Sequence, residues 1–437
     1  MASIHPEMTR IWLSAVAGAA LAVACDSTNP PVPLVPRIPS SDVWSGGDLT
    51  LVSASFAPPV PLPLVRLGTV TLPVSRVNDS TLTARLPDVN GTLSYSIEMP
   101  GFVTFIGSVT VHGFQSSQDG PLLTGFVQAI PGQPWVLGAG DPGLSEVDVR
   151  NNTVLRTWPD TVHSPDCTWG VGPSIRPGHY VLFGKAPGGN CTHPWVWQYG
   201  AQLVRKDSLF ATHVDEWSVA EIGPKGSIAG SDDNLWISSC DVTGCPTGRM
   251  YLAYGGSLTG VTIGTTVQRA ILHSFSGFLV NATTGDTIRR LQPASNYHLE
   301  GAVFSANEDT AFVCGSLQGS HLLMVASATG EVLDSLLVPG ALTYDIARDP
   351  ARPLLYVAAF EGAFAHTRPT LIVVDQGTLT PIATLRAPAN EELSLTEWHQ
   401  FRIVQDPQQH TVYVVATKQV YDLHGFTSKI LRFSLLP

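Results

Sequence analysis

The sequence predicts an all-β protein in which a small β-sandwich precedes a β-propeller, and three observations support this prediction. Glycine and proline are frequent, at 40 and 34 of the 437 residues, and they separate short apolar runs as turns separate strands. Charged residues make up only 14% of the chain, against roughly 25% in an average soluble domain. After residue 121, an apolar strand, a polar turn and a second apolar strand recur about every 45 residues, which is the period of a four-stranded propeller blade.

The overall charge disfavours one class of function. The 35 acidic residues outnumber the 24 basic residues and give a formal net charge of −11, and the basic residues form no run. A surface of that sign repels phosphate backbones. We therefore expect no nucleic-acid partner.

Residues 1–24 have the pattern of a signal peptide. Arg10 precedes an uncharged apolar stretch at residues 11–24, which is too short to span a bilayer but typical of a signal-peptide core. Small residues at 22–24 run directly into Cys25, and this segment resembles the lipobox of bacterial lipoproteins. The resemblance implies that Cys25 is lipidated, becomes the N-terminus and anchors the protein to a membrane of the bacterial cell envelope, on its extracytoplasmic side. The alternative is an ordinary secretory signal that is cleaved nearby.

Residues 25–37 follow as a proline-rich segment. Proline at this density disfavours a helix and favours extended, polyproline-like chain. We expect this segment to be a tether between the lipidated Cys25 and the folded body.

The cysteines after Cys25 are consistent with an exported chain, because disulfides form in oxidising compartments. The candidates are Cys167, Cys191, Cys240 and Cys245. The last two are close enough to close a small loop, and the first two could pair across neighbouring strands. The pair at 240 and 245 could instead be half of a zinc site, but no second cysteine or histidine pair completes it. Cys314 lies in an apolar run and is expected to be a buried thiol.

Residues 38–113 are expected to form the β-sandwich, because short strands alternate there with turns rich in Pro, Gly, Asn and Asp. Gly46-Gly-Asp-Leu-Thr-Leu51, Gly68 after an apolar strand, the segment 77–87 that ends in Thr-Ala-Arg-Leu-Pro, and Asn90-Gly-Thr92 resemble the IPT/TIG immunoglobulin-like module. The resemblance implies a spacer or binding module that carries no catalytic residues.

Residues 121–437 are expected to form the propeller. One apolar run marks each repeat: residues 135–138, 180–184, 235–239, 312–315, 356–359 and 413–416 are clear, and a seventh lies near 267–274. Seven blades are favoured and six are the alternative. The segments 347–357 and 404–414 share an Asp-Pro turn followed by Tyr-Val, which resembles the YVTN and quinoprotein-type propellers.

The segments that enter the innermost strands suggest one functional site, because an aromatic residue recurs there beside an acid or a histidine. Together these segments would form a channel mouth lined by Asp215, Glu216, His298, Glu300, Asp345, Glu397 and His399, with an aromatic rim of Trp169, Trp217, Tyr344 and Trp398. Clustered carboxylates bind cations or raise one another's pKa, and aromatic faces stack on sugars. The alternative is that these residues only connect neighbouring blades.

Two functions are compatible with this organisation. The first is a membrane-anchored binding or scaffold protein that presents the propeller to a protein or glycan ligand. The second is an extracytoplasmic, lactonase-like hydrolase that uses the acidic mouth with a divalent cation such as Ca²⁺. The motifs of serine hydrolases, zinc proteases, P-loop enzymes and dinucleotide-binding enzymes are absent from the sequence.

Overall fold

The protein consists of strands and turns. The computed structural model describes residues 35–120, 127–130, 133–140, 143–159, 258–264, 269–274, 277–282, 284, 286–291, 298–316, 320–363, 365–420 and 425–437, together with the strands between residues 168 and 252. Within this part, the only helical segments are two short 3-10 helices, η2 (Ala54–Phe56) and η4 (Ala389–Glu391), so the prediction of an all-β chain is confirmed. No helix among these residues is long and apolar enough to cross a bilayer.

The chain divides into two compact units. Of the described residues, the first unit contains 35–41, 49–85 and 94–107, and the second contains 42–48, 86–93 and those from 108 to 437.

Two sheets precede residue 113. The five-stranded sheet has the order β1 (Asp42–Trp44), β8 (Phe105–His112), β7 (Gly91–Glu98), β3 (Leu64–Leu67) and β4 (Val70–Leu72). The three-stranded sheet has the order β2 (Asp48–Val52), β6 (Thr81–Arg85) and β5 (Val74–Asn78). In the turn between β5 and β6, Asn78 Oδ1 accepts the Ser80 N–H at 2.9 Å, which is the bond expected of Asn in a tight turn.

The core of the first unit comes from strands of both sheets. Leu49 and Leu51 on β2 and Val65 on β3 are fully buried, as are Leu82 on β6 and Ile97 on β7. Leu49 and Leu51 are separated by a partly buried threonine, so the alternation that predicted a strand here is the alternation of a buried and a more exposed face.

Seven further sheets follow in sequence order within the described part of the second unit. They are β10 (Val127–Ala129), β11 (Trp135–Gly140), β12 (Gly143–Asp148) and β13 (Thr153–Pro159); β14 (Thr168–Pro173), β15 (Tyr180–Lys185) and β16 (Pro194–Tyr199); β17 (Val219–Gly223), β18 (Gly226–Gly230), β19 (Asn234–Ser238) and β20 (Gly248–Leu252); β21 (Leu258–Ile263), β22 (Arg269–Ser274), β23 (Phe278–Asn281) and β24 (Thr287–Arg290); β25 (His298–Phe304), β26 (Thr310–Ser316), β27 (Ser320–Ala326) and β28 (Val332–Val338); β29 (Ala341–Arg348), β30 (Leu354–Ala363), β31 (His366–Asp375) and β32 (Pro381–Arg386); and β33 (Trp398–Asp406), β34 (Thr411–Val420), β35 (Gly425–Ser434) and β9 (Phe114–Asp119). Within each of these sheets, neighbouring strands are antiparallel.

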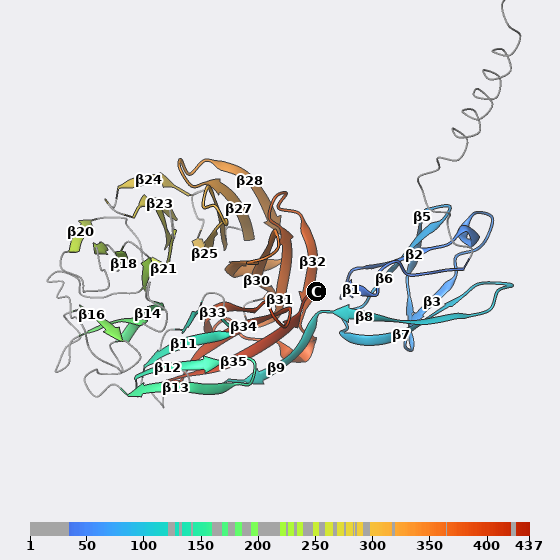
Figure 1. Ribbon diagram of the computed structural model, residues 1–437, viewed down its shortest axis with the longest axis horizontal. Coiled ribbons are helices and arrows are strands. Elements are labelled where there is room, and N and C mark those ends of the chain that lie inside the picture. Colours follow the sequence, from blue (N-terminus) through green and yellow to red (C-terminus); the bar gives the residue numbers. More distant parts are fainter. Residues whose placement is uncertain are drawn as a thin grey trace, which may run out of the picture. The chain divides into compact units, whose positions relative to one another are not determined.

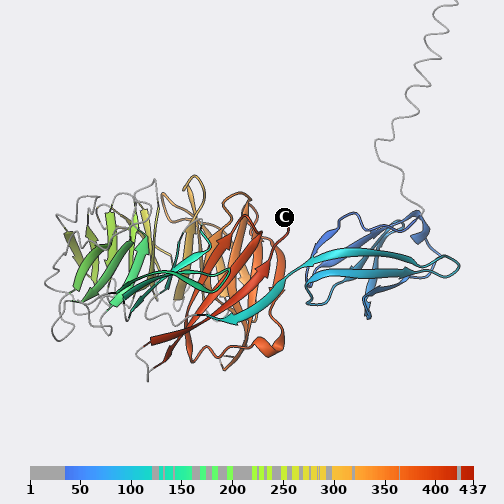
Figure 2. The same cartoon turned by 60° about the horizontal axis from the view of Figure 1, so that its bottom comes forward.

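The first strands of these sheets form a closed circuit. Each of β10, β14, β17, β21, β25, β29 and β33 contacts the first strand of the next sheet, and β33 contacts β10. The sheets are accordingly arranged around a circle (Figure 1), and the strands of neighbouring sheets run side by side in the second view (Figure 2). Each of the seven apolar runs found in the sequence lies in a different sheet, six of them in its second strand.

The last sheet combines distant parts of the chain. Its outer strand β9 pairs antiparallel with β35, in a register that joins Asp119 to Lys429 and Ser116 to Arg432. The strand before the first sheet therefore completes the last one and ties the two ends of the circle together. An apolar cluster between the first and last sheets, with Val136, Val147, Val415 and Ile430 fully buried, packs these ends against each other.

Candidate functional site

A β-bulge recurs near the start of the first strand in five of the seven sheets that the structure describes. The residue skipped by the strand pairing is Trp169 in β14, Thr259 in β21, Glu300 in β25, Tyr344 in β29 and His399 in β33. Four of these five belong to the predicted channel mouth. Because a bulge redirects a side chain and often lies next to a binding or active site, these equivalent positions form the candidate site.

The structure describes the predicted residues to different extents. The side chains of His298, Glu300, Tyr344, Asp345, Glu397 and Trp398 are described, and for Trp169 and His399 only the strand position is. Asp215, Glu216 and Trp217, the lipidation candidate Cys25 and the disulfide candidates Cys167, Cys191, Cys240 and Cys245 lie outside the described residues.

The side chains of His298 and Glu300 are brought together by β25. They lie two residues apart on this strand, with the bulge at Glu300. His298 Nδ1 lies 2.6 Å from Glu300 Oε1, and both side chains are about one-fifth exposed, at 18% and 21%. The bulged carboxylate is therefore held by a histidine from its own strand.

The carboxylate of Asp345 has a different role. It follows the bulge in β29, and its Oδ2 accepts the backbone N–H of Ile403 on β33 at 2.7 Å. Burial raises the pKa of Asp345, while the charge of Arg402 and two backbone N–H groups act in the opposite direction. This side chain connects two neighbouring sheets.

The aromatic ring of Tyr344 packs into the interior. Its ring centre lies 5.5 Å from that of Phe360 and 4.8 Å from that of Phe401. Burial, followed by the negative charge of Glu300, raises the pKa of Tyr344 to about 12. Tyr344 thus joins the bulge in β29 to the cluster between the last two sheets, and its hydroxyl remains protonated at neutral pH.

The two remaining candidates lie at the start of β33. Glu397 is half-exposed and forms an ion pair with Lys418 of β34. Trp398 is partly buried and packs against the same apolar cluster as Tyr344. Among the described residues, neither side chain forms a hydrogen bond or an ion pair with Glu300 or Asp345.

His273 was missed by the sequence analysis. It lies on β22, is 6% exposed and reaches the adjacent sheet, where its Nδ1 lies 3.1 Å from the carbonyl oxygen of Glu300. A carbonyl only accepts, so Nδ1 carries a proton and donates it to Glu300; Nε2 lies 3.1 Å from the hydroxyl of Thr262, which is also within 3.2 Å of the carbonyl oxygen of Ala302. Burial, and then the positive charges of Arg402 and His298, lower the pKa of His273 to about 3. A neutral histidine thus holds the backbone of the bulged residue.

The residue that follows the bulge in β25, Gly301, is packed so closely that it must be a glycine. A Cβ on Gly301 would lie 3.0 Å from the Cα of Asp345 and 3.1 Å from the Sγ of Cys314. Cys314 is a buried free thiol, as the sequence predicted, and burial raises its pKa, with a further contribution from the negative charges of Asp345 and Glu300. The thiol is a packing group and remains protonated.

No three of the described histidine, cysteine, aspartate and glutamate side chains gather closely enough to hold a metal ion. In the described part of the site, each of the three carboxylates has its own partner: a histidine for Glu300, a lysine for Glu397 and a backbone amide for Asp345. The three described carboxylates therefore have separate partners, while the acidic mouth as a whole, which also includes Asp215, Glu216 and His399, stays a prediction.

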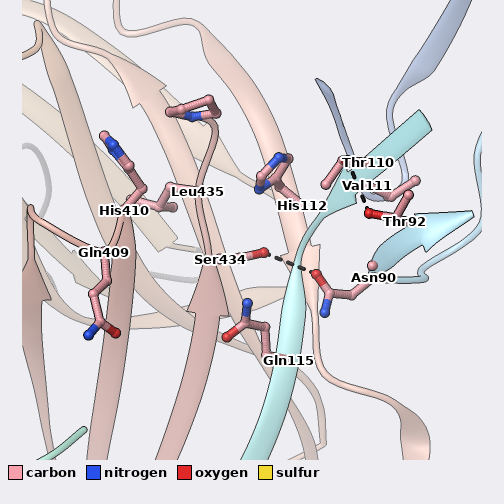
Figure 3. A pocket seen from close by; sticks show the side chains of 12 residues that line it. Asn90, Thr92, Thr110, Val111, His112, Gln115, Gln409, His410, Ser434 and Leu435 are labelled. Carbon is pink, nitrogen blue, oxygen red and sulfur yellow. Dashed lines mark hydrogen bonds between the residues drawn. The ribbon is translucent and has the colours of Figure 1, made fainter. Parts of the chain in front are cut away.

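A polar hollow also lies wholly within the second unit. It has a volume of about 260 Å³ and is lined by uncharged polar groups and two histidines, among them Asn90, His112, Gln409, His410 and Ser434 (Figure 3). The Ser434 hydroxyl already bonds to Asn90 Oδ1 at 3.0 Å, and His112 Nε2 lies 2.9 Å from Asp42 Oδ1. The hollow is smaller than the roughly 300 to 1,000 Å³ of typical ligand pockets, and the Ser434 hydroxyl and His112 Nε2 are already bonded, so it is not the stronger candidate.

No protein-family model matches the sequence, and no curated protein is similar enough to count as a relative.

Proposed function

We propose that this chain is a lipid-anchored, extracytoplasmic binding protein in which an immunoglobulin-like sandwich carries a seven-bladed β-propeller. The seven successive sheets and the closed circuit of their first strands support the propeller. The two sheets before residue 113 and the core that they share support the sandwich. The ligand is a protein or glycan of the cell envelope.

The recurring bulge is the observation that carries the binding site. It places an aromatic, acidic or histidine residue at the same point of four first strands, β14, β25, β29 and β33, and a threonine at that point of β21. Residues at that point converge on one mouth of a propeller, where repeated polar and aromatic groups suit a ligand with repeated features. The site residues of this proposal are His298, Glu300, Tyr344 and His399, with Trp169 and Trp398 at the rim.

The pairing of the carboxylates favours binding over cation-assisted hydrolysis. A catalytic cation needs several oxygen ligands directed at one point. The described carboxylates instead have separate partners: His298 for Glu300, Lys418 for Glu397 and the backbone N–H of Ile403 for Asp345. Glu300, with its histidine, is the one best placed to receive a hydrogen-bonding ligand.

The substitution Glu300→Gln tests the binding site. The full chain is expected to bind at least one class of glycan on an array of bacterial envelope glycans, and the variant is expected to bind it about tenfold more weakly because it loses a charge-assisted hydrogen bond. Glu331→Gln is the matched control, since Glu331 is an exposed glutamate in a turn of the same sheet. Equal binding by all three proteins, or hydrolysis of a lactone or ester substrate that Glu300→Gln abolishes, would contradict the binding function.

The substitution Cys25→Ser tests the anchor. The wild-type protein is expected in the membrane fraction, with an N-terminal peptide whose mass includes acyl chains. The variant lacks the sulfur that carries the lipid, so its N-terminal peptide is expected without acyl chains and with the leader uncleaved. A wild-type peptide that is cleaved elsewhere and carries no lipid would show that the leader is an ordinary secretory signal.

A further inference from the structure

Large apolar side chains are exposed at the tip of the β7–β8 hairpin. Val103 is 82% exposed, Ile106 77% and Phe102 50%. Leu64, which is 37% exposed, pairs with Glu98, the last residue of β7. Leu62, which is 45% exposed, lies two residues before Leu64. We call these five side chains the hairpin-tip patch. Figures 1 and 2 both show this hairpin extending beyond the other strands of the first unit.

The hairpin-tip patch is not needed for the core of its unit. The core is formed by other side chains, such as Leu49 and Ile97, which are fully buried. The turn is closed by a backbone bond, from the N–H of Phe102 to the carbonyl of Met99 at 3.1 Å. Residues 99–106 contain no charge. A cluster of exposed apolar groups that serves no internal packing marks an interaction surface.

The charge of the first unit indicates what this surface meets. The described residues of this unit contain Arg37, Arg66, Arg76 and Arg85 but only Asp79 and Glu98, a formal charge of +2 in a chain whose net charge is −11. The acid nearest the tip, Glu98, forms an ion pair with Arg66. Exposed apolar groups on a unit of net positive charge suit the interface of an anionic bilayer.

The length of the tether brings the same unit to the membrane. Nine residues lie between Cys25 and Val35, the first described residue, and the ten residue steps from Cys25 to Val35 span at most about 35 Å. We infer that the hairpin-tip patch inserts into the interface of the anionic bilayer that holds the lipidated Cys25. The inference rests on the proposed function in one respect: the lipid anchor at Cys25 determines which membrane the patch meets. The contact between the patch and a bilayer is argued separately, from the exposed apolar side chains and the positive charge of the first unit.

Vesicle binding without the lipid tests the patch separately from the anchor. The chain from residue 25 onward, with Cys25→Ser, is mixed with unilamellar vesicles of phosphatidylcholine alone or with a quarter of phosphatidylglycerol, and bound protein is sedimented. We expect binding to the anionic vesicles that weakens with salt. The double substitution Phe102→Ser and Val103→Ser should weaken it by about tenfold or more, because two apolar side chains lose their insertion.

Exposed apolar residues elsewhere provide the matched control. Val332 and Leu333 on β28 are 46% and 52% exposed. Val332→Ser with Leu333→Ser should leave vesicle binding unchanged. The inference is overturned if the parent chain does not bind anionic vesicles, or if both double variants lose binding equally. It is also overturned if the tip substitutions abolish self-association in sedimentation velocity without affecting vesicle binding. That last result would mean that the patch binds a second copy of the chain. Lipidation of Cys25 is read from the mass of its peptide, so either proposal can fail while the other stands.

Discussion

Acidification from pH 7.5 to 4.5 is expected to lower the free energy of unfolding by roughly 3 kcal/mol through His273 alone. The pKa of this histidine is about 3 in the folded protein, against an ordinary value of 6.5 for histidine. Between pH 6.5 and pH 3, His273 is protonated in the unfolded chain but neutral in the folded chain, so the free energy of unfolding falls as the pH falls. The cause is the site of the imidazole, which is buried and lies near the positive charges of Arg402 and His298.

The substitution His273→Asn isolates this contribution. Asparagine can still donate to the carbonyl of Glu300, but it does not titrate, so the variant should lose much less stability than the wild type between pH 7.5 and 4.5. His410→Asn is the control, because His410 is exposed and has a backbone φ of 46°, which asparagine tolerates. Denaturant unfolding at a series of pH values measures the difference. Parallel pH profiles for the wild type and His273→Asn would show that His273 is not held neutral.

Much of the strand pattern could be predicted from the sequence because its signals are local. The apolar runs that mark the repeats each lie in a different sheet, since a buried central strand needs consecutive apolar residues. The aromatic, acidic and histidine residues singled out near Trp169, Glu300, Tyr344 and His399 lie at equivalent bulges. Because the repeats recur along the chain, the sequence alone indicates that these residues occupy equivalent positions in different sheets.

The contacts across sheets could not be predicted in this way. Asp345 looked like part of an acidic mouth, but its partner is a backbone amide 58 residues further along the chain. His273 lies within an apolar strand, which was the available signal, but the sequence does not show which neighbouring sheet it reaches. Strand β9 pairs with a strand about 300 residues away, and its polar sequence gave no sign of that pairing. Such pairings depend on which strands the closed circle brings together.

The substitution Asp349→Ala is expected to lower stability by about 3 to 5 kcal/mol, because Asp349 fixes the Asp-Pro turn between β29 and β30. Its Oδ1 accepts the backbone N–H groups of Ala351 at 2.8 Å and Arg352 at 2.9 Å. Its Oδ2 accepts the hydroxyl of Tyr356 at 2.5 Å and Nε of Arg352 at 2.9 Å. Asp349 is 6% exposed and Tyr356 1%, so water cannot replace these bonds.

The second copy of the motif is the natural comparison for Asp349. In the turn between β33 and β34, Asp406 Oδ1 accepts from the backbone of Gln408 and Gln409 at 3.1 and 3.2 Å. Among the described residues, however, neither Asp406 Oδ2 nor the hydroxyl of Tyr413 has a hydrogen-bond partner. Asp406→Ala therefore removes two hydrogen bonds rather than four, together with a 4.0 Å ion pair between Asp406 Oδ2 and Arg150, and should cost about 1 to 2 kcal/mol. Denaturant unfolding of both variants at pH 7.5 tests the difference. Equal losses would mean that the turn alone, and not the bond to the buried tyrosine, accounts for the role of this aspartate.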